Sequence, residues 1–581
     1  MPVHLPPPTS EVQLTPTSTA VNQEADRRRG SEGIFTVTRD QPDGASLPML
    51  LAISGTIIVA NCLIGIFAPI MAGLDDEIAV LDTLWRIVAG QLIGIDYHTY
   101  GVGPYLVGTL LWHWFGPHSL LMRFSITLFC LAIAVCGCVV AKRNLPGRSD
   151  LALLFCLTLA FQLSAPTIYP DETLLSIAGF HDRLVDGALA VLFLQAFGYA
   201  PQSRYAGVID AALTAFLLNV LFLTKISGLV LGLGIVSAGC LSHRCARARV
   251  VSLCLAVLAF VAMTVAEFTA TGLQFAPLIQ DYEFAARSRL TYSFYDLARG
   301  LAFPPLAGSV VLLLLFAAGH GAGERRIDAM QICLLVGSYA ACQFALKMAT
   351  DFGPSTSLAP AAVASLAGCL GTKPIVGLTD DTGRKRWSSA FSRLGKISVR
   401  DAIPFFIFAC VLLPQVLSSL IGIFVGSLVA FGIEASYVVD GGKGIKFTLL
   451  NPRRAGVGQF ESSLNDAASA LVSLNLDREP IANLDFPNPF PVLLLAPPPR
   501  GVHAWVFWGF KMPRGAVLRW QDVIGDACVV TLPARPNMQE MAGPLADTVR
   551  PKLAADFKIV YRDELWTIYR QAQGCTAASE P

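Results

Sequence analysis

The sequence predicts an α-helical polytopic membrane protein with about eleven transmembrane helices, followed by a C-terminal soluble α/β domain. Of the 581 residues, 54% are hydrophobic and 15% are charged, whereas a soluble protein carries about 25% charged residues. Many apolar residues lie in runs of about 17–25 positions, the length that crosses a bilayer as a helix. The last 150 residues instead hold 15 basic and 15 acidic residues and no such run. This composition excludes a wholly soluble protein and a largely disordered one.

The apolar runs divide the chain into three regions. Residues 1–48 have no apolar run and are rich in Pro, Thr and Ser, so we expect a disordered cytoplasmic tail. Residues 49–431 form the expected transmembrane domain, and residues 432–581 form the expected extracytoplasmic α/β domain. Helical spans are expected at 49–71, 118–141, 151–168, 185–200, 206–223, 226–242, 250–271, 302–319, 328–346, 356–371 and 402–430.

Lys and Arg are unevenly divided between the two sides of these spans. With the N-terminus in the cytoplasm, the cytoplasmic segments hold 20 of them and the opposite side holds 8 before residue 432. Cytoplasmic loops carry the excess of positive charge, so we expect the N-terminus inside and the C-terminus outside. Residues 104–116 are expected to form an interfacial helix with Trp112 and Trp114 at headgroup level. The formal net charge of +1 lacks the basic surplus of a nucleic-acid-binding protein.

The C-terminal region has its own periodicities. Apolar residues at helical spacing predict a helix over 460–476. Residues 491–497, 503–510 and 527–533 are strand-like, 496–501 form a loop, and 557–571 are expected to form a hairpin that turns at Asp563–Glu564. Of the 14 cysteines, only Cys528 and Cys575 lie here, and they are able to pair in an oxidising compartment if their side chains meet. The others lie in or beside apolar runs and are expected to act as small hydrophobic residues.

Three loops on the outer side are longer than the connections that packed helices need. They cover residues 73–105, 167–186 and 274–299, and together they mix acids, cations, His and Tyr. Because all three emerge on one face, we expect them to form a functional surface.

The first loop begins with Asp75, Asp76 and Glu77. One interpretation is solvated charge plus a helix N-cap, because acids stabilise a helix N-terminus. The other is a general base, because a partly desolvated carboxylate beside a like charge has a raised pKa. The residues alone leave both interpretations open.

Further polar residues follow in the first two loops. Asp96, His98 and Tyr100 precede a Gly- and Pro-rich turn at 101–104. They either satisfy the backbone of that turn or form a second wall of one cavity. The second loop contributes Asp171, His181, Asp182 and Arg183.

Cations also gather on the outer side. An ionisable group inside the hydrocarbon costs about 2.5–3.5 kcal/mol, so such a side chain snorkels to the interface or serves a site. Several cations at one depth suit an anionic phosphate. The candidates are Arg123, Arg183, Lys225, Arg287, Arg289 and Lys347.

These outer-loop segments resemble a known family. The acidic pair after the first span is followed by DYHTYGVGPY at 96–105, LWHWFGPHSLLMR at 111–123 and HDR at 181–183. Such motifs are similar to those of the GT-C membrane glycosyltransferases, above all the bacterial branch related to protein mannosyltransferases and lipid A aminoarabinose transferases. The strongest match covers residues 49–145, whereas residues 432–581 do not resemble the large outer domains of the best-known members.

The resemblance implies a polyprenyl-phosphate sugar donor, an inverting transfer to a hydroxyl of a lipid, glycan or protein, and an active site on the outer face of a bacterial inner membrane. It implies that Asp75 or Asp76 is the base. It implies that Arg183, Arg287, Arg289 and Lys347 hold the donor phosphate. Glu77, Asp96, His98, Tyr100, Asp171, His181 and Asp182 are the other expected substrate contacts. Some members use a divalent metal ion, which this acidic cluster permits without requiring.

Two other functions fit part of the same pattern. A transporter or flippase of lipid-linked sugars would show internal repeats and charges near the membrane midplane, and neither is seen. An envelope scaffold that acts through residues 432–581 would leave the polar outer loops unexplained.

Overall fold

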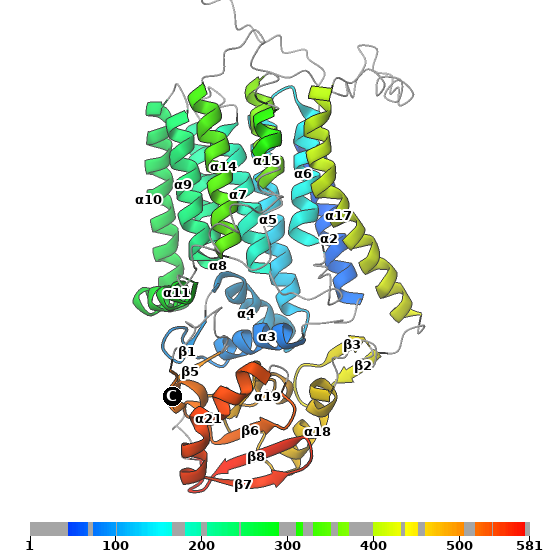
Figure 1. Ribbon diagram of the computed structural model, residues 1–581, viewed down its shortest axis with the longest axis vertical. Coiled ribbons are helices and arrows are strands. Elements are labelled where there is room, and N and C mark those ends of the chain that lie inside the picture. Colours follow the sequence, from blue (N-terminus) through cyan, green and yellow to red (C-terminus); the bar gives the residue numbers. More distant parts are fainter. Residues whose placement is uncertain are drawn as a thin grey trace, which may run out of the picture.

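The structure is a computed structural model that describes most of the chain. It describes residues 45–67, 74–99, 101–165, 180–198, 206–242, 246–289, 310–315, 317, 329–349, 358–370, 399–431, 436–450, 459–504, 517–536 and 539–575. Within these residues a bundle of long helices is joined to a smaller α/β part (Figure 1).

The bundle helices run side by side along the long axis of the molecule (Figure 1). They are α2 (Leu47–Phe67), α5 (Leu121–Asn144), α6 (Ser149–Ser164), α7 (Phe180–Phe197), α8 (Ala206–Thr224), α9 (Ile226–Ser242), α10 (Ala246–Thr271), α14 (Ala329–Ala349), α15 (Leu358–Leu370) and α17 (Val399–Ala430). Each overlaps one expected span. The expected span at 302–319 lies mostly outside the described residues.

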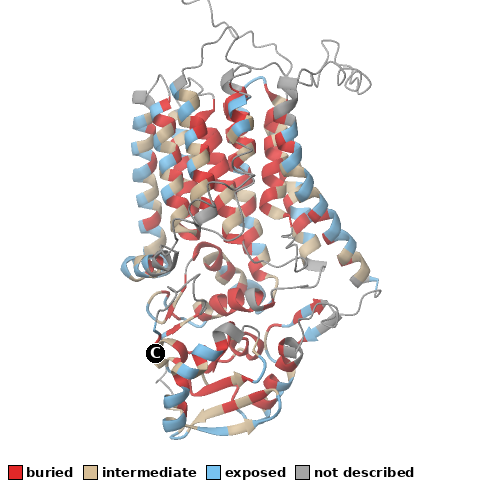
Figure 2. Ribbon diagram, in the orientation of Figure 1, coloured by how far each residue is buried: buried red, intermediate tan, exposed pale blue. Residues whose placement is uncertain are grey.

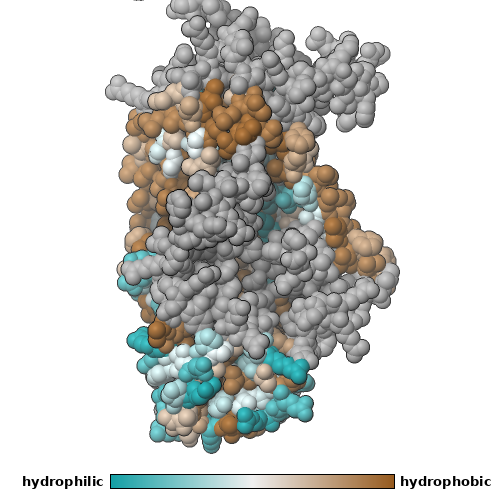
Figure 3. Space-filling model, in the orientation of Figure 1, coloured by the Kyte–Doolittle hydropathy of each residue, from teal (hydrophilic) through white to brown (hydrophobic). Residues whose placement is uncertain are grey.

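Five helices among the described residues are long and apolar enough to cross a membrane: α2, α5, α8, α10 and α17. Four more, α6, α9, α14 and α15, contain shorter apolar segments. The apolar side chains of α10 and α17 point outward, and the surface of the bundle is largely hydrophobic (Figure 3). Such a surface is stable only in lipid. The chain is therefore a multi-pass integral membrane protein, while the number eleven stays a prediction.

The interior of the bundle is built around α7. Nearly every residue of this helix from Leu184 onward is buried (Figure 2). Small residues allow the close packing, since a Cβ at Gly187 would lie 2.5 Å from Leu163 Cδ2. Close packing of this kind drives helix association where lipid removes the hydrophobic driving force.

One end of the bundle carries three further helices, α3 (Leu74–Val88), α4 (Gly103–Phe115) and α11 (Phe275–Arg289). We call this the domain end, because the α/β part lies beyond it (Figure 1). Helix α4 is the expected interfacial helix, and Trp114 is 78% exposed. Trp112 is instead buried, with its ring stacked on Trp85 at 5.3 Å, so it is not exposed at headgroup level as expected.

Residues 436–575, called the C-terminal domain below, form a mixed α/β structure. A hairpin of β2 (Ser436–Val439) and β3 (Phe447–Leu450) precedes a sheet of order β4–β6–β8–β7. Its strands are β4 (Ile481–Asn483), β6 (Val529–Pro533), β7 (Phe557–Arg562) and β8 (Trp566–Gln571), and only β4–β6 is parallel. The helices are α18 (Gln459–Ser473), α19 (Phe490–Leu494), α20 (Trp520–Ile524) and α21 (Gln539–Asp556).

Several expected elements of this region are confirmed and one is wrong. The helix near 460–476, the strand near 527–533, the loop at 496–501 and the hairpin over 557–571 are present. The strand expected at 491–497 is wrong, because residues 490–494 form α19. A short buried apolar run fits a strand or a helix equally well, and a proline at the start of the helix favours the helix. Most of 503–510 lies outside the described residues.

Cys528 and Cys575 form a disulfide, with Cα atoms 5.4 Å apart and a sequence separation of 47 residues. The bond ties the start of β6 to the segment after β8. The meeting of these two side chains, which the sequence left open, is thereby confirmed.

Replacing both cysteines by Ser is expected to destabilise the C-terminal domain by about 4 kcal/mol, because a loop of this length is constrained in the unfolded chain. Thermal unfolding of the wild-type protein should shift downward when dithiothreitol is added. The double Ser variant should unfold at that lower temperature with or without the reductant. A wild-type midpoint that ignores the reductant would contradict the prediction.

Candidate functional site

The acidic turn Asp75–Glu77 forms the start of α3 at the domain end. The side chains of Asp75 and Asp76 lie outside the described part. Glu77 is 1% exposed, and its Oε1 accepts a hydrogen bond of 2.9 Å from Nη2 of Arg123. Arg123 also donates from Nη1 to the carbonyl of Gly65 at 2.7 Å. One largely buried arginine, 12% exposed in its side chain, thus joins α2, α3 and α5 at this end.

The second outer loop ends in the first turn of α7, where His181, Asp182 and Arg183 lie. His181 is buried, with Nε2 3.3 Å from the carbonyl oxygen of Gly101 in the first loop. Lys225, between α8 and α9, lies 2.7 Å from Asp182 Oδ1. Arg183 Nη1 donates to the carbonyl of Ala165 at 2.7 Å. The first and second loops therefore meet, as expected from their common face.

Gly101 explains why the two loops approach so closely. Its φ is +76°, a conformation that residues with a side chain rarely adopt. A Cβ there would lie 2.2 Å from His181 Nε2. Glycine is thus needed at position 101 of the expected turn, both for the backbone conformation and for the close contact with the second loop.

His98 connects the first loop to the third loop and to the C-terminal domain. Its Nδ1 lies 2.6 Å from Oδ1 of Asp281 in α11. Its ring lies 4.7 Å from the ring of His503, which belongs to β5 (Val502–His503), the strand that pairs in parallel with β1 (Tyr97–His98). The other oxygen of Asp281, Oδ2, is buried and has no hydrogen-bond partner among the described residues. Three segments that are distant in sequence meet at this residue.

The hydrogen bond to the Asp281 carboxylate raises the pKa of His98, burial opposes this, and the charges of Asp281 and Asp522 add to the rise. Because the pKa of His98 is raised in the folded protein, the contact contributes its full stabilisation at pH values below the unfolded pKa of about 6.5. That stabilisation is lost as the pH rises through the folded pKa.

Replacing His98 by Gln is expected to lower the thermal midpoint more at pH 5.5 than at pH 8.5, because the charged contact exists only at low pH. The measurement is thermal unfolding of both proteins in detergent across this range. His118→Gln, an exposed histidine next to α4, is the control and should show no such dependence. A loss that is equal at both pH values would contradict the prediction.

Asp96 supports a different turn, the one just before β1. Its Oδ2 accepts a hydrogen bond from the backbone of Leu92 at 2.7 Å. Its Oδ1 lies 4.0 Å from Nε of Arg500 in the C-terminal domain. The hydrogen bond of Asp96 thus goes to residue 92 and not to the turn at 101–104 that the sequence suggested, and its contact with substrate stays a prediction.

The remaining expected site residues are only partly described. Tyr100 and Asp171 lie outside the described residues. Arg287 and Arg289 belong to α11 and Lys347 belongs to α14, but their side chains lie outside the described part. Their distances from the acidic turn therefore stay predictions.

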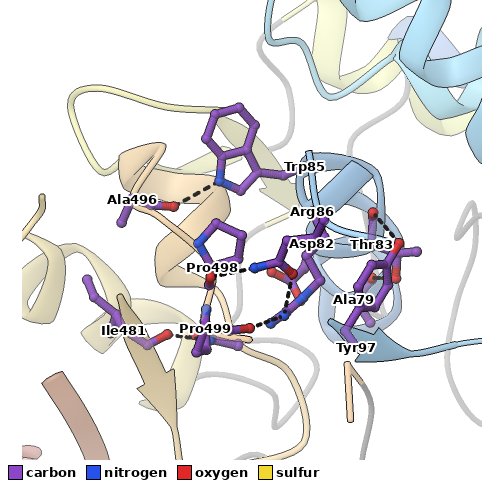
Figure 4. Close-up of polar contacts among 12 residues, drawn as sticks. Ala79, Asp82, Thr83, Trp85, Arg86, Tyr97, Ile481, Ala496, Pro498 and Pro499 are labelled. Atoms are coloured by element: carbon purple, nitrogen blue, oxygen red, sulfur yellow. Dashed lines mark hydrogen bonds and ion pairs between the residues drawn. The ribbon is translucent and has the colours of Figure 1, made fainter. Parts of the chain in front are cut away.

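Helix α3 is also bound to the C-terminal domain (Figure 4). Arg86 forms an ion pair of 2.8 Å with Asp82 and donates to the carbonyl of Pro499 at 2.7 Å. Trp85 Nε1 donates to the carbonyl of Ala496 at 2.9 Å. The contact involves charges that are wholly buried, since Arg86 and Asp82 are 1% and 0% exposed.

Sequence reasoning missed three of these contacts. The Asp82–Arg86 spacing of four residues on an amphipathic helix was a usable signal for an ion pair. Nothing in the sequence indicates that Arg86 binds a backbone carbonyl near residue 499, or that Asp281 is the acid that faces His98.

The described residues contain no group of three or more His, Cys, Asp and Glu arranged to hold a metal ion. Glu77 is already paired with Arg123.

No protein-family model matches the chain, and no curated protein matches it. Among solved structures it resembles ArnT from Cupriavidus metallidurans in the apo state, with 14% identity, a TM-score of 0.47, and coverage of 89% of this chain and 97% of that chain. It also resembles ArnT from the same organism bound to undecaprenyl phosphate, with 14% identity, a TM-score of 0.44, and coverage of 90% and 97%.

Proposed function

We propose that the protein is a GT-C glycosyltransferase that moves a sugar from a polyprenyl-phosphate donor to a hydroxyl acceptor at the domain end. The observation that supports this most is that the first outer loop contacts the other two at the domain end, through His98 and Asp281 and through Gly101 and His181. Charged pairs lie in the same loops. The described pairs are Glu77–Arg123, Asp182–Lys225 and His98–Asp281. A lipid-linked donor needs this position, because its chain lies in the membrane and its sugar phosphate lies in water.

The chemistry requires a base and a phosphate site. A carboxylate must take the proton from the acceptor hydroxyl, and cations must stabilise the charge that develops on the leaving phosphate. Because Glu77 is engaged by Arg123, we assign the base to Asp75 or Asp76. Arg183, Arg287, Arg289 and Lys347 are the proposed phosphate contacts. One base suffices for an inverting transfer, in which the acceptor attacks from the side opposite the phosphate.

The surroundings of the reaction are proposed on the same basis. The domain end is taken as extracytoplasmic, because Lys and Arg are sparse in the loops of that side. The acceptor is a hydroxyl of a lipid, a glycan or a protein. If the reaction uses a divalent ion, Asp75 and Asp76 hold it, and chelation would then abolish transfer without unfolding the protein.

The test is transfer from a radiolabelled polyprenyl-phosphate sugar by the purified protein in lipid nanodiscs, with lipid extracts, glycans and envelope proteins as acceptors. A labelled acceptor that appears only with active protein supports the proposal. Movement of the intact labelled donor across a vesicle membrane, without transfer, would favour the flippase. Neither transfer nor movement, together with a defect that residues 436–575 alone restore in cells, would favour the scaffold.

A further inference from the structure

We propose that Arg86 is a positioning residue through which the C-terminal domain fixes helix α3 and, with it, the acidic turn Asp75–Glu77. This inference rests on the proposed function, because it assigns the C-terminal domain a part in the same reaction. The geometry that carries it is the set of buried contacts around the last turn of α3 (Figure 4).

The guanidinium of Arg86 donates hydrogen bonds on both sides of the contact. On its own side, Nε donates to Asp82 Oδ2 at 2.8 Å and Nη1 reaches Gln91 Oε1 at 3.3 Å. Toward the C-terminal domain, Nη1 donates to the carbonyl of Pro499 at 2.7 Å. The guanidinium carbon lies 5.4 Å from the centre of the Tyr97 ring. The planar fork of arginine holds several acceptors in one fixed geometry, whereas the ammonium of lysine is a compact charge with rotatable donors.

The partner segment, residues 496–499, consists of Ala followed by three prolines, and we call it the proline strap. Besides Pro499, its Pro498 carbonyl accepts from Gln91 Nε2 at 2.7 Å and its Ala496 carbonyl accepts from Trp85 Nε1 at 2.9 Å. Prolines have fixed φ angles and no N–H group. The proline strap is therefore a stiff row of hydrogen-bond acceptors, and ordering it against α3 costs little conformational entropy.

Helix α3 transmits this fixation to the acidic turn. An α-helix rises 1.5 Å per residue, so Asp75 lies about 16 Å from Arg86 along one short rigid rod. The other end of the rod is held by Arg123, which binds Glu77 at 2.9 Å. Arg123 thus ties α3 to the bundle, and the buried Arg86 ties it to the C-terminal domain. A misplacement of about 1 Å at a reacting group can cost a factor of about 100 in rate.

The experiment compares Arg86→Lys and the pair Asp82→Leu/Arg86→Met with the wild-type protein in the transfer assay. The pair removes both buried charges, so it is the variant expected to keep the fold. We expect kcat to fall at least about tenfold, with the KM for the donor within about twofold, because the donor site does not include Arg86. A purely structural role would lower the amount of folded enzyme and leave kcat per folded molecule unchanged.

Arg570→Gln is the matched control, since it breaks the pair with Glu479 inside the C-terminal domain without touching α3. It should leave kcat unchanged. If Asp82→Leu/Arg86→Met is folded and retains the wild-type kcat, the proposal is wrong.

A second readout separates this inference from the proposed function. Amide hydrogen exchange at residues 75–81 should be faster in both Arg86 variants than in the control, whether or not any sugar is transferred. Unchanged exchange there would overturn the positioning role by itself. Absence of transfer by the wild-type protein would overturn only the proposed function.

Discussion

Replacing Asp75 by Asn or Asp76 by Asn is expected to reduce transfer by a factor of about 100 to 10,000 in one of the two variants, because general-base catalysis contributes that much. Asn has nearly the same shape as Asp and keeps its ability to cap a helix. The start of α3 should therefore keep its structure, and the loss should appear in kcat/KM rather than in the thermal midpoint. The assay uses the labelled donor and whichever acceptor the wild-type protein modifies.

Asp210→Asn is the control for this prediction. Asp210 lies near the start of α8, where it pairs with Arg143 at 3.1 Å, and it belongs to no proposed contact with donor or acceptor. Its substitution should leave the rate unchanged. Wild-type rates in both Asp75→Asn and Asp76→Asn would remove the base from α3 and reopen the choice among the other carboxylates of the domain end.

The sequence predicted the parts of the fold that depend on composition and periodicity over many residues. The bundle helices lie where apolar runs of membrane-spanning length occur, because each run must bury its own backbone hydrogen bonds in lipid. The hairpin over 557–571 was visible because strand-like residues flank Asp563, whose Oδ1 accepts the backbone hydrogen bonds of Leu565 and Trp566. Such signals are local, and no distant contact is needed to read them.

The contacts that organise the site are not local. The pairing of Tyr97–His98 with Val502–His503 involves two residues on each side, too few for any strand periodicity. Arg86 binds a backbone carbonyl. Because every residue has a backbone carbonyl, the sequence does not show which one is bound. The apolar run that forms α19 was wrongly expected to be a strand. Its conformation is decided by flanking prolines and by burial on all sides, which the apolar pattern alone does not show. The three loops could be placed on one face from topology, but their partners could not.

Breaking the Glu77–Arg123 pair is expected to be the most destabilising change at the domain end. Arg123→Met alone leaves the Glu77 charge buried without its partner, and breaking a buried pair in this way costs about 3–5 kcal/mol. The side chains are 2% and 12% exposed, so solvent does little to replace the lost partner. We expect little folded protein for this variant, measured as the monodisperse fraction in size-exclusion chromatography after heating.

Glu77→Met together with Arg123→Met should recover most of that loss, because two apolar side chains carry no desolvation cost. The recovery will be incomplete, since the Gly65 carbonyl loses its donor, a loss of about 1–3 kcal/mol. The double variant thus separates two roles of Glu77. If it folds and transfers sugar, Glu77 serves the structure of α3. If it folds and does not transfer while Asp75 and Asp76 are intact, Glu77 or Arg123 acts on the substrate as well.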